Sequence, residues 1–297
     1  MNAITFSDIK KIYGSQIVLN AVSSNIAPGQ VVGLLGRNGA GKTTLLQILY
    51  GLISPDSGSR QILGLDPKKD LVEMRRKVGF VSEECHYYKW MTAMMLEKFL
   101  APLYPSWTRD TYKTLMTNLE IPVDKKIGEL SKGTRRKLML AAAVAMKPEL
   151  LLLDEPLGGM DLVVRGQVLT TIIDTLTERG VTILISSHEI DEISGVCDKV
   201  IILSQGNFII DEEVSPLTQS VRKIVAILES PVESFPTHQQ IISAKSQGTQ
   251  LELVVKNFTD DLPRTLLSNY KTKDIKVEGL SLEQIFIALA AKKEELL

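Results

Sequence analysis

A glycine-rich segment at residues 36–43 constrains the fold of this chain more than any other feature. It has the spacing G-x-x-x-x-G-K-[ST], follows the apolar run Val31–Leu35 and precedes a helical pattern over 43–52. Glycines let the backbone N–H groups of such a loop surround a phosphate, and the following helix points its positive end at the anion. The segment therefore predicts a strand, a phosphate-binding loop and a helix in succession.

The polar residues of this loop have separate chemical roles. We expect the Lys42 ammonium to contact the β- and γ-phosphates of a nucleotide and to act in catalysis, and the Thr43 hydroxyl to ligate Mg²⁺. The predicted phosphate-binding residues are Gly36, Asn38, Gly39, Ala40, Gly41, Lys42, Thr43 and Thr44.

Strand-like and helix-like patterns alternate after this loop. Short apolar runs at 150–153, 181–185 and 200–203 suit strands that are buried on both faces, and helical patterns cover 135–146 and 162–178. The alternation predicts an α/β fold with a mixed, mostly parallel core sheet. Before the loop, residues 3–12 and 17–26 flank a turn and predict an antiparallel start to that sheet.

Two regions have a different pattern. Residues from about 84 to 147 read as a mostly helical insertion within a first domain, 1–214. After Ser215-Pro216 the pattern changes to short strands at 222–228, 239–256 and 274–277, with helices at 260–268 and 281–295. We expect residues 215–297 to form a small α+β accessory domain.

Composition excludes several classes of protein. The 34 Lys and Arg balance 35 Asp and Glu, and aromatic residues make up 5% of the chain, which argues against a nucleic-acid-binding surface. Two cysteines, Cys85 and Cys197, make neither a disulfide framework nor a metal set. No apolar run reaches the length of a membrane span, and no secretory signal is expected.

Polar residues follow two of the predicted strands. Asp154 and Glu155 come directly after the run 150–153, and His188 follows 181–185. In open α/β sheets, ligands bind at the carboxyl ends of the strands. We expect Asp154 to hold Mg²⁺ through water and Glu155, on the other side of the strand by alternation, to activate the attacking water. His188 is expected to contact the γ-phosphate and that water.

A further segment gives these elements a family resemblance. Leu130-Ser131-Lys132-Gly133-Thr134 resembles the Leu-Ser-Gly-Gly-Gln signature of ATP-binding cassette (ABC) ATPases, a group of P-loop NTPases. The ordered set over residues 1–214 is similar to that family. The resemblance implies that Tyr13 stacks on adenine, that Asp154 and Glu155 form the Walker B element, and that His188 is the switch histidine. It also implies ATP and Mg²⁺ as cofactors.

The resemblance implies a dimer with shared sites. Two ABC ATPase chains, identical or different, would sandwich two ATP molecules head to tail, and hydrolysis would release the pair. Ser131, Gly133 and the D-loop residue Asp161 would then contact the nucleotide of the facing subunit. The resemblance is nearest to bacterial exporters whose transmembrane permease is a separate chain. The implied location is therefore the cytoplasmic face of the cell membrane, where that permease would hold the chain.

Two positions depart from the family pattern. Glu83 stands where the family has the Q-loop glutamine, and we expect its carboxylate to lie near Mg²⁺. Lys132 and Thr134 replace the first glycine and the glutamine of the signature. These changes mark a branch of the family and leave their effect on the hydrolysis rate open.

Some alternatives stay open at this point. A soluble ABC ATPase that acts on nucleic acid or ribosomes, or a regulatory cassette with a silenced site, would carry many of the same motifs. The Met- and aromatic-rich residues 84–100 are either a groove for a membrane partner or the core of the insertion. The basic cluster of Lys132, Arg135, Arg136 and Lys137 either steers the nucleotide or forms a solvated helix face. The second interpretation is favoured for every residue of the cluster except the start of the helix.

Overall fold

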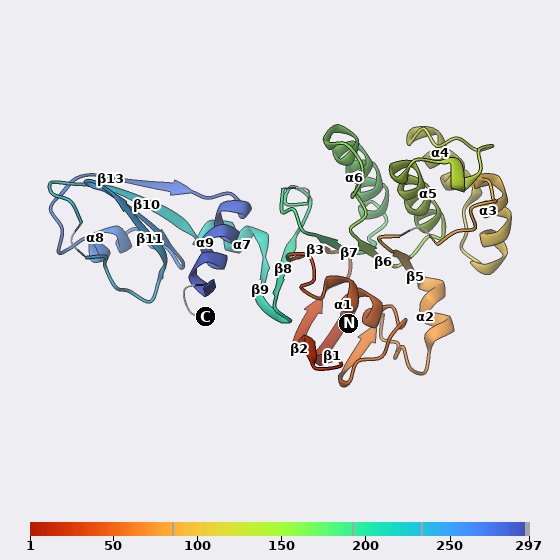
Figure 1. The fold of residues 1–297 in the computed structure, drawn as a ribbon, viewed down its shortest axis with the longest axis horizontal. Helices are drawn as coiled ribbons and strands as arrows, with labels where there is room; N and C mark the ends of the chain where they lie inside the picture. Colours follow the sequence, from red (N-terminus) through yellow and green to blue (C-terminus); the bar gives the residue numbers. More distant parts are fainter. Residues whose placement is uncertain (85, 192, 233, 295–297) are drawn as a thin grey trace. The chain divides into compact units, whose positions relative to one another are not determined.

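Six strands of the chain form one sheet, which includes the strand before the phosphate loop. The structure is a computed structural model that describes residues 1–84, 86–191, 193–232 and 234–294. Neighbouring strands of this sheet lie in the order β5 (Val78–Val81), β6 (Leu150–Asp154), β7 (Thr182–Ser187), β3 (Val31–Leu35), β8 (Lys199–Ser204) and β9 (Asn207–Glu213) (Figure 1). The pairs from β5 through β8 are all parallel, which confirms the predicted mostly parallel core sheet. Parallel strands place their carboxyl ends at one edge, where the candidate site lies.

The antiparallel start of the chain forms a sheet of its own. The strands β1 (Ile4–Tyr13), β2 (Gln16–Ile26) and β4 (Ser57–Ile62) lie in the order β2-β1-β4. The prediction that this start joins the core sheet is therefore wrong. Strand β1 pairs with a neighbour on both edges, which leaves it no edge for the core sheet.

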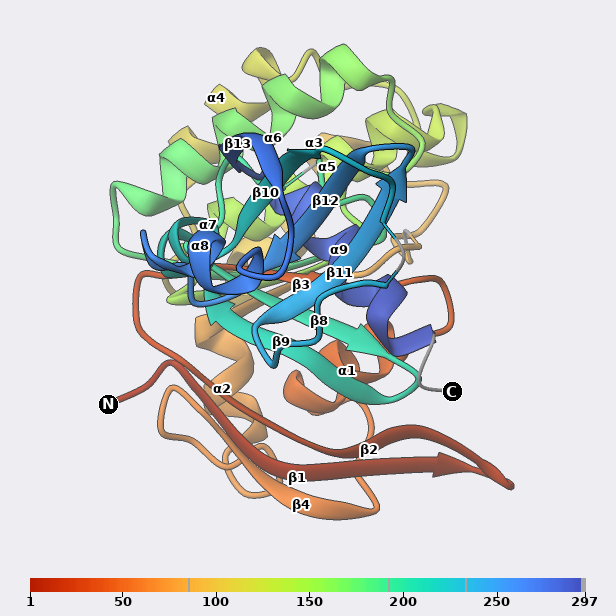
Figure 2. The same ribbon diagram turned by 90° about the vertical axis from the view of Figure 1, so that its left-hand side faces the viewer.

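Helix α1 (Lys42–Leu49) fills the space between the two sheets (Figures 1 and 2). Its apolar side chains, including Leu46 and Leu49, are fully buried and belong to one core cluster with Ile4 of β1 and Val32 of β3. Burial of this helix against both sheets holds its N-terminus, and so the phosphate loop, in place.

The remaining helices of the first part of the chain come mostly from residues 84–147. This segment contains α3 (Ala93–Leu100), η1 (Ala101–Leu103), α4 (Arg109–Asn118), η2 (Ile127–Glu129) and α5 (Lys132–Ala145). Two more helices, α2 (Leu71–Lys77) and α6 (Leu162–Thr177), lie outside this segment of the sequence. Helix α5 begins before the predicted residue 135 because the Ser131 side chain caps it, accepting a hydrogen bond from the Thr134 N–H at 3.1 Å.

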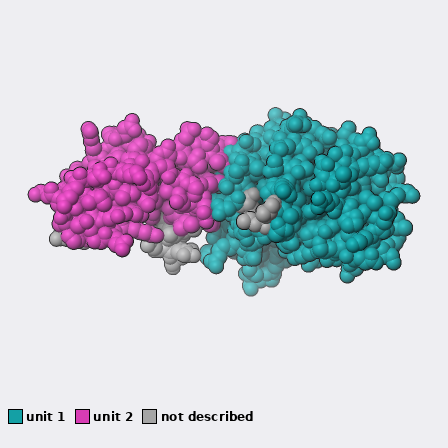
Figure 3. Space-filling view, turned by 90° about the horizontal axis from the view of Figure 1, so that it is seen from above, with its two compact units in different colours: residues 1–211 teal, residues 212–297 magenta. Residues whose placement is uncertain are grey.

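The chain divides into two compact units, Met1–Asp211 and Glu212–Leu297, coloured separately in Figure 3. The described part of the second unit holds an antiparallel sheet with helices beside it: β11 (Ile241–Gln247), β12 (Gln250–Val255), β10 (Arg222–Leu228), β13 (Thr272–Gly279), α7 (Val214–Ser220), α8 (Leu262–Leu266) and α9 (Leu282–Glu294). Alternate residues of β10 and β12 build its apolar core, which includes Ile224, Leu251 and Leu253.

Two sequence expectations concern membranes and cysteines. Over the described residues, every helix is too short or too polar to span a bilayer. Cys85 lies outside the described residues. Cys197 is buried, and burial raises the pKa of its thiol to about 12.

Candidate nucleotide-binding and catalytic site

The phosphate loop connects β3 to α1 with a backbone that requires glycine. Gly39 and Gly41 have φ angles of +80° and +109°, in the left-handed region that side chains disfavour. At Gly36 the φ angle is ordinary, but a Cβ there would collide with the carbonyl oxygen of Leu203. The glycine spacing that predicted the loop therefore reflects both strained backbone and close packing.

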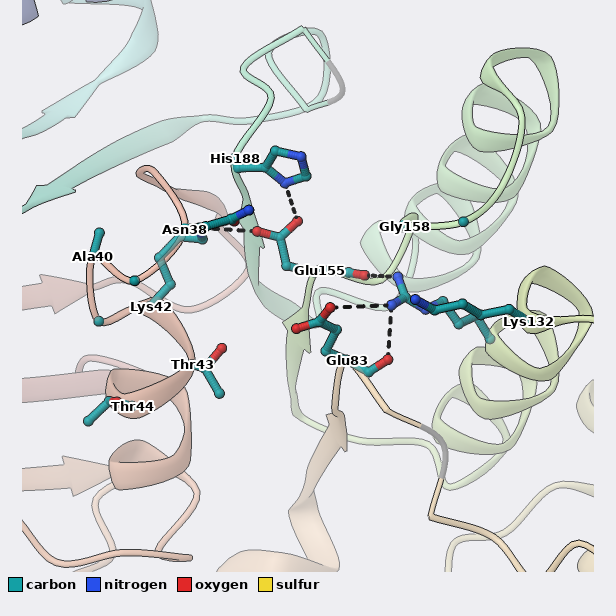
Figure 4. A pocket seen from close by; sticks show the side chains of 14 residues that line it. Asn38, Ala40, Lys42, Thr43, Thr44, Glu83, Lys132, Glu155, Gly158 and His188 are labelled. Atoms are coloured by element: carbon teal, nitrogen blue, oxygen red, sulfur yellow. Dashed lines mark hydrogen bonds and ion pairs between the residues drawn. The ribbon is translucent and has the colours of Figure 1, made fainter.

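A cavity of about 370 Å³ lies in front of this loop (Figure 4). The described residues that line it come from the loop, from the ends of β5, β6 and β7, and from α5: Asn38, Gly39, Ala40, Gly41, Lys42, Thr43, Thr44, Glu83, Lys132, Arg136, Glu155, Gly158, Gly159 and His188. The fold thus gathers the predicted loop residues from Asn38 to Thr44 with Glu83, Glu155 and His188 around one space, while Gly36 is not among the residues that line it.

Lys42 is fixed within the loop. Its side chain is buried, and the ammonium donates hydrogen bonds to the Gly36 carbonyl at 2.6 Å and to the Arg37 carbonyl at 3.4 Å. The same Nζ lies 3.1 Å from Oε1 of Glu155 in an ion pair that lacks the direction of a hydrogen bond. A phosphate in the cavity would meet this positive charge directly.

Glu155 receives contacts on both its side chain and its backbone. His188 Nδ1 lies 2.9 Å from Oε2, and the Glu155 N–H donates to Ser186 Oγ at 3.0 Å. Strand β6 ends at Asp154, and Glu155 has a φ of +46°. Strand alternation, on which the predicted direction of the side chain rested, therefore does not extend to Glu155: this residue follows the strand with a left-handed backbone, and its carboxylate lies near Lys42 and His188.

Asp154 is buried beside the loop. Its Oδ1 accepts hydrogen bonds from the Thr43 hydroxyl at 3.1 Å and from Ser186 at 2.9 Å. Among the described residues, no group hydrogen-bonds its buried Oδ2. Burial is the largest cause that raises the pKa of this carboxyl. A free carboxylate oxygen beside a threonine hydroxyl is the type of oxygen site that Mg²⁺ uses, so these residues fit that ion.

Glu83 lies close by but faces another partner. Its carbonyl oxygen accepts a hydrogen bond from Arg136 Nη2 at 2.9 Å, and its carboxylate Oε1 lies 4.0 Å from the same nitrogen. The negative charge of Glu83 is the smallest of the causes that raise the pKa of Asp154. The role of Glu83 as a metal ligand stays a prediction.

Arg136 and Ser186 are the residues that sequence reasoning missed. Arg136 is 2% exposed, so the solvated face expected for it is wrong. Its helical position could have revealed this, because residues 139, 140 and 143 of the same face of α5 are apolar and buried. Ser186 is fully buried within β7 and links Asp154 to Glu155, and its sequence position gives no sign of that bridge.

Four further predicted site residues do not line this cavity: Tyr13, Ser131, Gly133 and Asp161. Tyr13 ends β1 with its side chain 49% exposed, and Lys11 Nζ lies 5.3 Å from the centre of its ring. Ser131 and Asp161 cap α5 and α6, and Gly133 packs close to the Gly159 carbonyl.

The chain is similar to known proteins in three comparisons. A family model described as "ABC transporter" matches residues 19–158. The chain is 32% identical to the ABC transporter ATP-binding protein YtrB of Bacillus subtilis (strain 168), over 94% of each chain. It is 31% identical to the bacitracin transport ATP-binding protein BcrA of Bacillus licheniformis, over 89% of this chain and 92% of BcrA.

The fold has solved counterparts. A bacterial ABC transporter cassette that was solved as a dimer matches with a TM-score of 0.63 and 25% identity, over 71% of this chain and 98% of that one. The likeness to YtrB reaches far beyond the phosphate loop and includes most of the second unit. Because the match runs along almost the whole chain, the chain belongs to the ABC transporter family, as one of its ATP-binding and ATP-hydrolysing subunits.

Proposed function

We propose that this subunit hydrolyses Mg-ATP at an interface with a second ABC ATPase chain, and that hydrolysis powers export through a separate transmembrane permease. The observation that carries the proposal is the convergence of Lys42 and His188 on Glu155 at the carboxyl edge of the core sheet. The match to transport proteins favours this function over one on nucleic acid or ribosomes.

In the proposed reaction, Glu155 is the general base. Its carboxylate would accept a proton from the water that attacks the γ-phosphate. The ion pair with Lys42 holds Oε1, and a bound phosphate would compete for that ammonium and so release Oε1 to accept the proton. His188 holds Oε2 at 2.9 Å and keeps the carboxylate directed into the cavity.

The residues that would hold Mg²⁺ are Thr43 and Asp154, with Glu83 as the predicted third group. A bound Mg²⁺ would neutralise charge on the β- and γ-phosphates. The hydrogen bond between Thr43 and Asp154 at 3.1 Å brings the two oxygens close enough to share one cation, and Oδ2 of Asp154, which no described group hydrogen-bonds, is available to it or to its water.

The adenine and the facing subunit complete the proposed site. Tyr13, exposed at the end of β1, would stack on the adenine ring. Ser131, Gly133 and Asp161 would contact the nucleotide held by the second chain, since backbone N–H groups at the start of α5 can bind an anion. The dimeric state of a cassette with the same fold supports this arrangement.

The proposed permease contact is on the helical insertion. Tyr88, Trp90, Met94, Met95 and Phe99 each expose about half or more of their surface, and the Tyr88 and Trp90 rings stack at 5.9 Å. Buried Met91 and Leu96 supply the core of this region, so the exposed set is not needed for it. Such a patch suits an amphipathic helix of the permease and would hold the chain at the cytoplasmic face of the membrane.

Co-purification tests this assignment. The tagged chain, expressed in its own host, is expected to bring down a protein with about six apolar stretches of about 20 residues each. Replacing Trp90 and Phe99 together by Ser should abolish the capture, whereas the matched change of exposed Val72 and Leu52 should not. Salt-sensitive binding to nucleic acid, without a membrane protein, would instead favour the alternative function.

We further propose that residues 215–297 act as an accessory domain. The apolar core of the second unit, built around Ile224 and Leu253, supports a separate folding unit. Limited proteolysis of the whole protein should yield two stable fragments that separate between 205 and 222. Cleavage spread evenly along 215–297 would contradict an independent domain.

A further inference from the structure

Arg136 occupies an unusual position for an arginine on α5. It is buried, it lines the cavity, and its guanidinium contacts the backbone of two separate segments. Nη1 donates to the Glu155 carbonyl in a short contact, and Nη2 donates to the Glu83 carbonyl at 2.9 Å. The dashed lines at Glu83 and Glu155 in Figure 4 mark these interactions. One side chain thus joins the end of β5 to the end of β6.

We propose that Arg136 is a positioning residue that fixes the direction of the Glu155 carboxylate through the backbone. The proposal rests on the assignment of Glu155 as the general base. The Glu155 N–H is held by Ser186 at 3.0 Å, and its carbonyl is held by Arg136. With both peptide groups anchored, the side chain leaves the backbone in one direction.

The conformation of Glu155 explains why such an anchor is needed. A φ of +46° is unfavourable for a residue with a side chain and costs about 1 kcal/mol or more. Without the hydrogen bond from Arg136, the backbone could relax to an ordinary φ and turn the carboxylate away from Lys42. The predicted consequence is a loss of catalysis rather than a loss of nucleotide affinity.

Only arginine has the shape for this bridge. Its planar guanidinium carries two Nη groups that donate in different directions, whereas lysine presents a single point charge. The charge also lies 4.0 Å from the Glu83 carboxylate, which offsets part of the cost of burial. Arg136→Lys should therefore keep the charge but lose one of the two carbonyl contacts.

Gly158 provides the space for this side chain. A Cβ at position 158 would collide with Nη1 of Arg136, while its φ lies outside the left-handed region. Gly158→Ala is thus expected to displace the guanidinium without backbone strain. Gly166 is the matched control, because a Cβ there meets no atom within 4 Å.

The test compares steady-state ATP hydrolysis and equilibrium ATP binding in full-length variants. Arg136→Gln and Gly158→Ala should each lower kcat about tenfold to a hundredfold and leave ATP affinity within about threefold of wild type. Arg136→Lys should fall between Arg136→Gln and wild type. The controls Arg179→Gln and Gly166→Ala, at positions away from the cavity, should keep wild-type rates.

Combining the changes gives the decisive readout. The double variant carries both Arg136→Gln and Gly158→Ala. If Gly158→Ala acts by displacing Arg136, the kcat of this double variant should be no lower than that of Arg136→Gln alone. Multiplicative losses, or losses in ATP affinity that match those in kcat, would overturn the positioning role. If Arg136→Gln does not fold, Gly158→Ala with its Gly166 control still decides, since unchanged kcat in that variant also overturns it.

A parallel Glu155→Gln variant separates this inference from the assignment beneath it. An inactive Glu155→Gln with wild-type kcat in Arg136→Gln refutes the role of Arg136 and leaves Glu155 as the base. Turnover that persists in Glu155→Gln refutes the base itself, and the positioning role is refuted with it.

Discussion

His188 and Glu155 face each other across the carboxyl edge of the core sheet, with Nδ1 of the imidazole 2.9 Å from Oε2 of the carboxylate. His188 follows β7 and Glu155 follows β6, two strands that lie side by side in parallel. On its other oxygen, Glu155 meets Lys42 at 3.1 Å. The Glu155 carboxylate therefore contacts two side chains from separate motifs: Lys42 of the phosphate loop and His188 after β7.

His188→Ala tests the first of these contacts. Loss of the imidazole frees Oε2 and removes a group that can contact the γ-phosphate, so kcat should fall about a hundredfold or more with ATP binding retained. Single-turnover hydrolysis measures the change. His238→Ala, in the second unit, is the control and should keep the wild-type rate; an equal loss there would indicate general damage.

Lys42→Ala should abolish ATP binding. The variant removes the buried positive charge that the loop presents to the phosphates and leaves the Glu155 carboxylate facing the cavity without its ion pair. Titration with a fluorescent ATP analogue measures the affinity, and Lys68→Ala, at an exposed position, serves as the control. Retained micromolar affinity in Lys42→Ala would refute the phosphate-loop assignment.

Ser186→Ala should lower both the stability of the protein and its rate of ATP hydrolysis. The variant leaves the partly buried N–H of Glu155 without its acceptor and removes the buried hydroxyl that donates to Asp154. Unsatisfied buried groups of this kind cost about 1–3 kcal/mol in the free energy of unfolding. Urea denaturation measures that cost, with exposed Ser246→Ala as control. Unchanged stability would mean that the bridge through Ser186 contributes little.

Cys197 should make stability depend on pH in alkaline solution. Burial, with a smaller effect of the Asp198 charge, raises its thiol pKa from 9.0 to about 12. The unfolded chain loses this proton from about pH 9, while the folded chain keeps it, so the stability present below pH 9 is lost as the pH rises toward 12. Unfolding measured at about pH 8 and about pH 10.5 should show this loss.

A comparison in a Cys85→Ser background isolates the contribution of Cys197. Adding Cys197→Ala should make the free energy of unfolding fall less between the two pH values, because the titrating thiol is gone. An identical fall in both proteins would show that the Cys197 thiol is not protected by the fold.

The sequence was enough to predict that the site residues lie together, because each motif is a short continuous segment and the core strands are parallel. Asp154 and His188 follow apolar runs, the loop that leads to Thr43 follows another, and parallel strands bring such ends to one edge. The strands β3, β6, β7 and β8 read correctly from the sequence for the same reason: burial on both faces leaves few polar residues in them.

Features set by tertiary contacts were not predictable. Strand β4 (Ser57–Ile62) buries only Arg60 and Ile62, so no alternating apolar pattern announces it, and pairing with β1 creates it. The direction of Glu155 depends on a left-handed backbone that Arg136 and Ser186 support from distant segments. In the sequence, Arg136 is one of four basic residues on a helix, and only its contacts distinguish it.

The most direct test of the whole account is ATP turnover by Glu155→Gln. The amide keeps the size of the side chain and loses the ability to take a proton, so steady-state hydrolysis should cease while ATP binding persists. With hydrolysis stopped, ATP should hold two chains together, and size-exclusion chromatography with ATP should show a dimer that the wild type forms only transiently. Hydrolysis at the wild-type rate in Glu155→Gln would contradict the account.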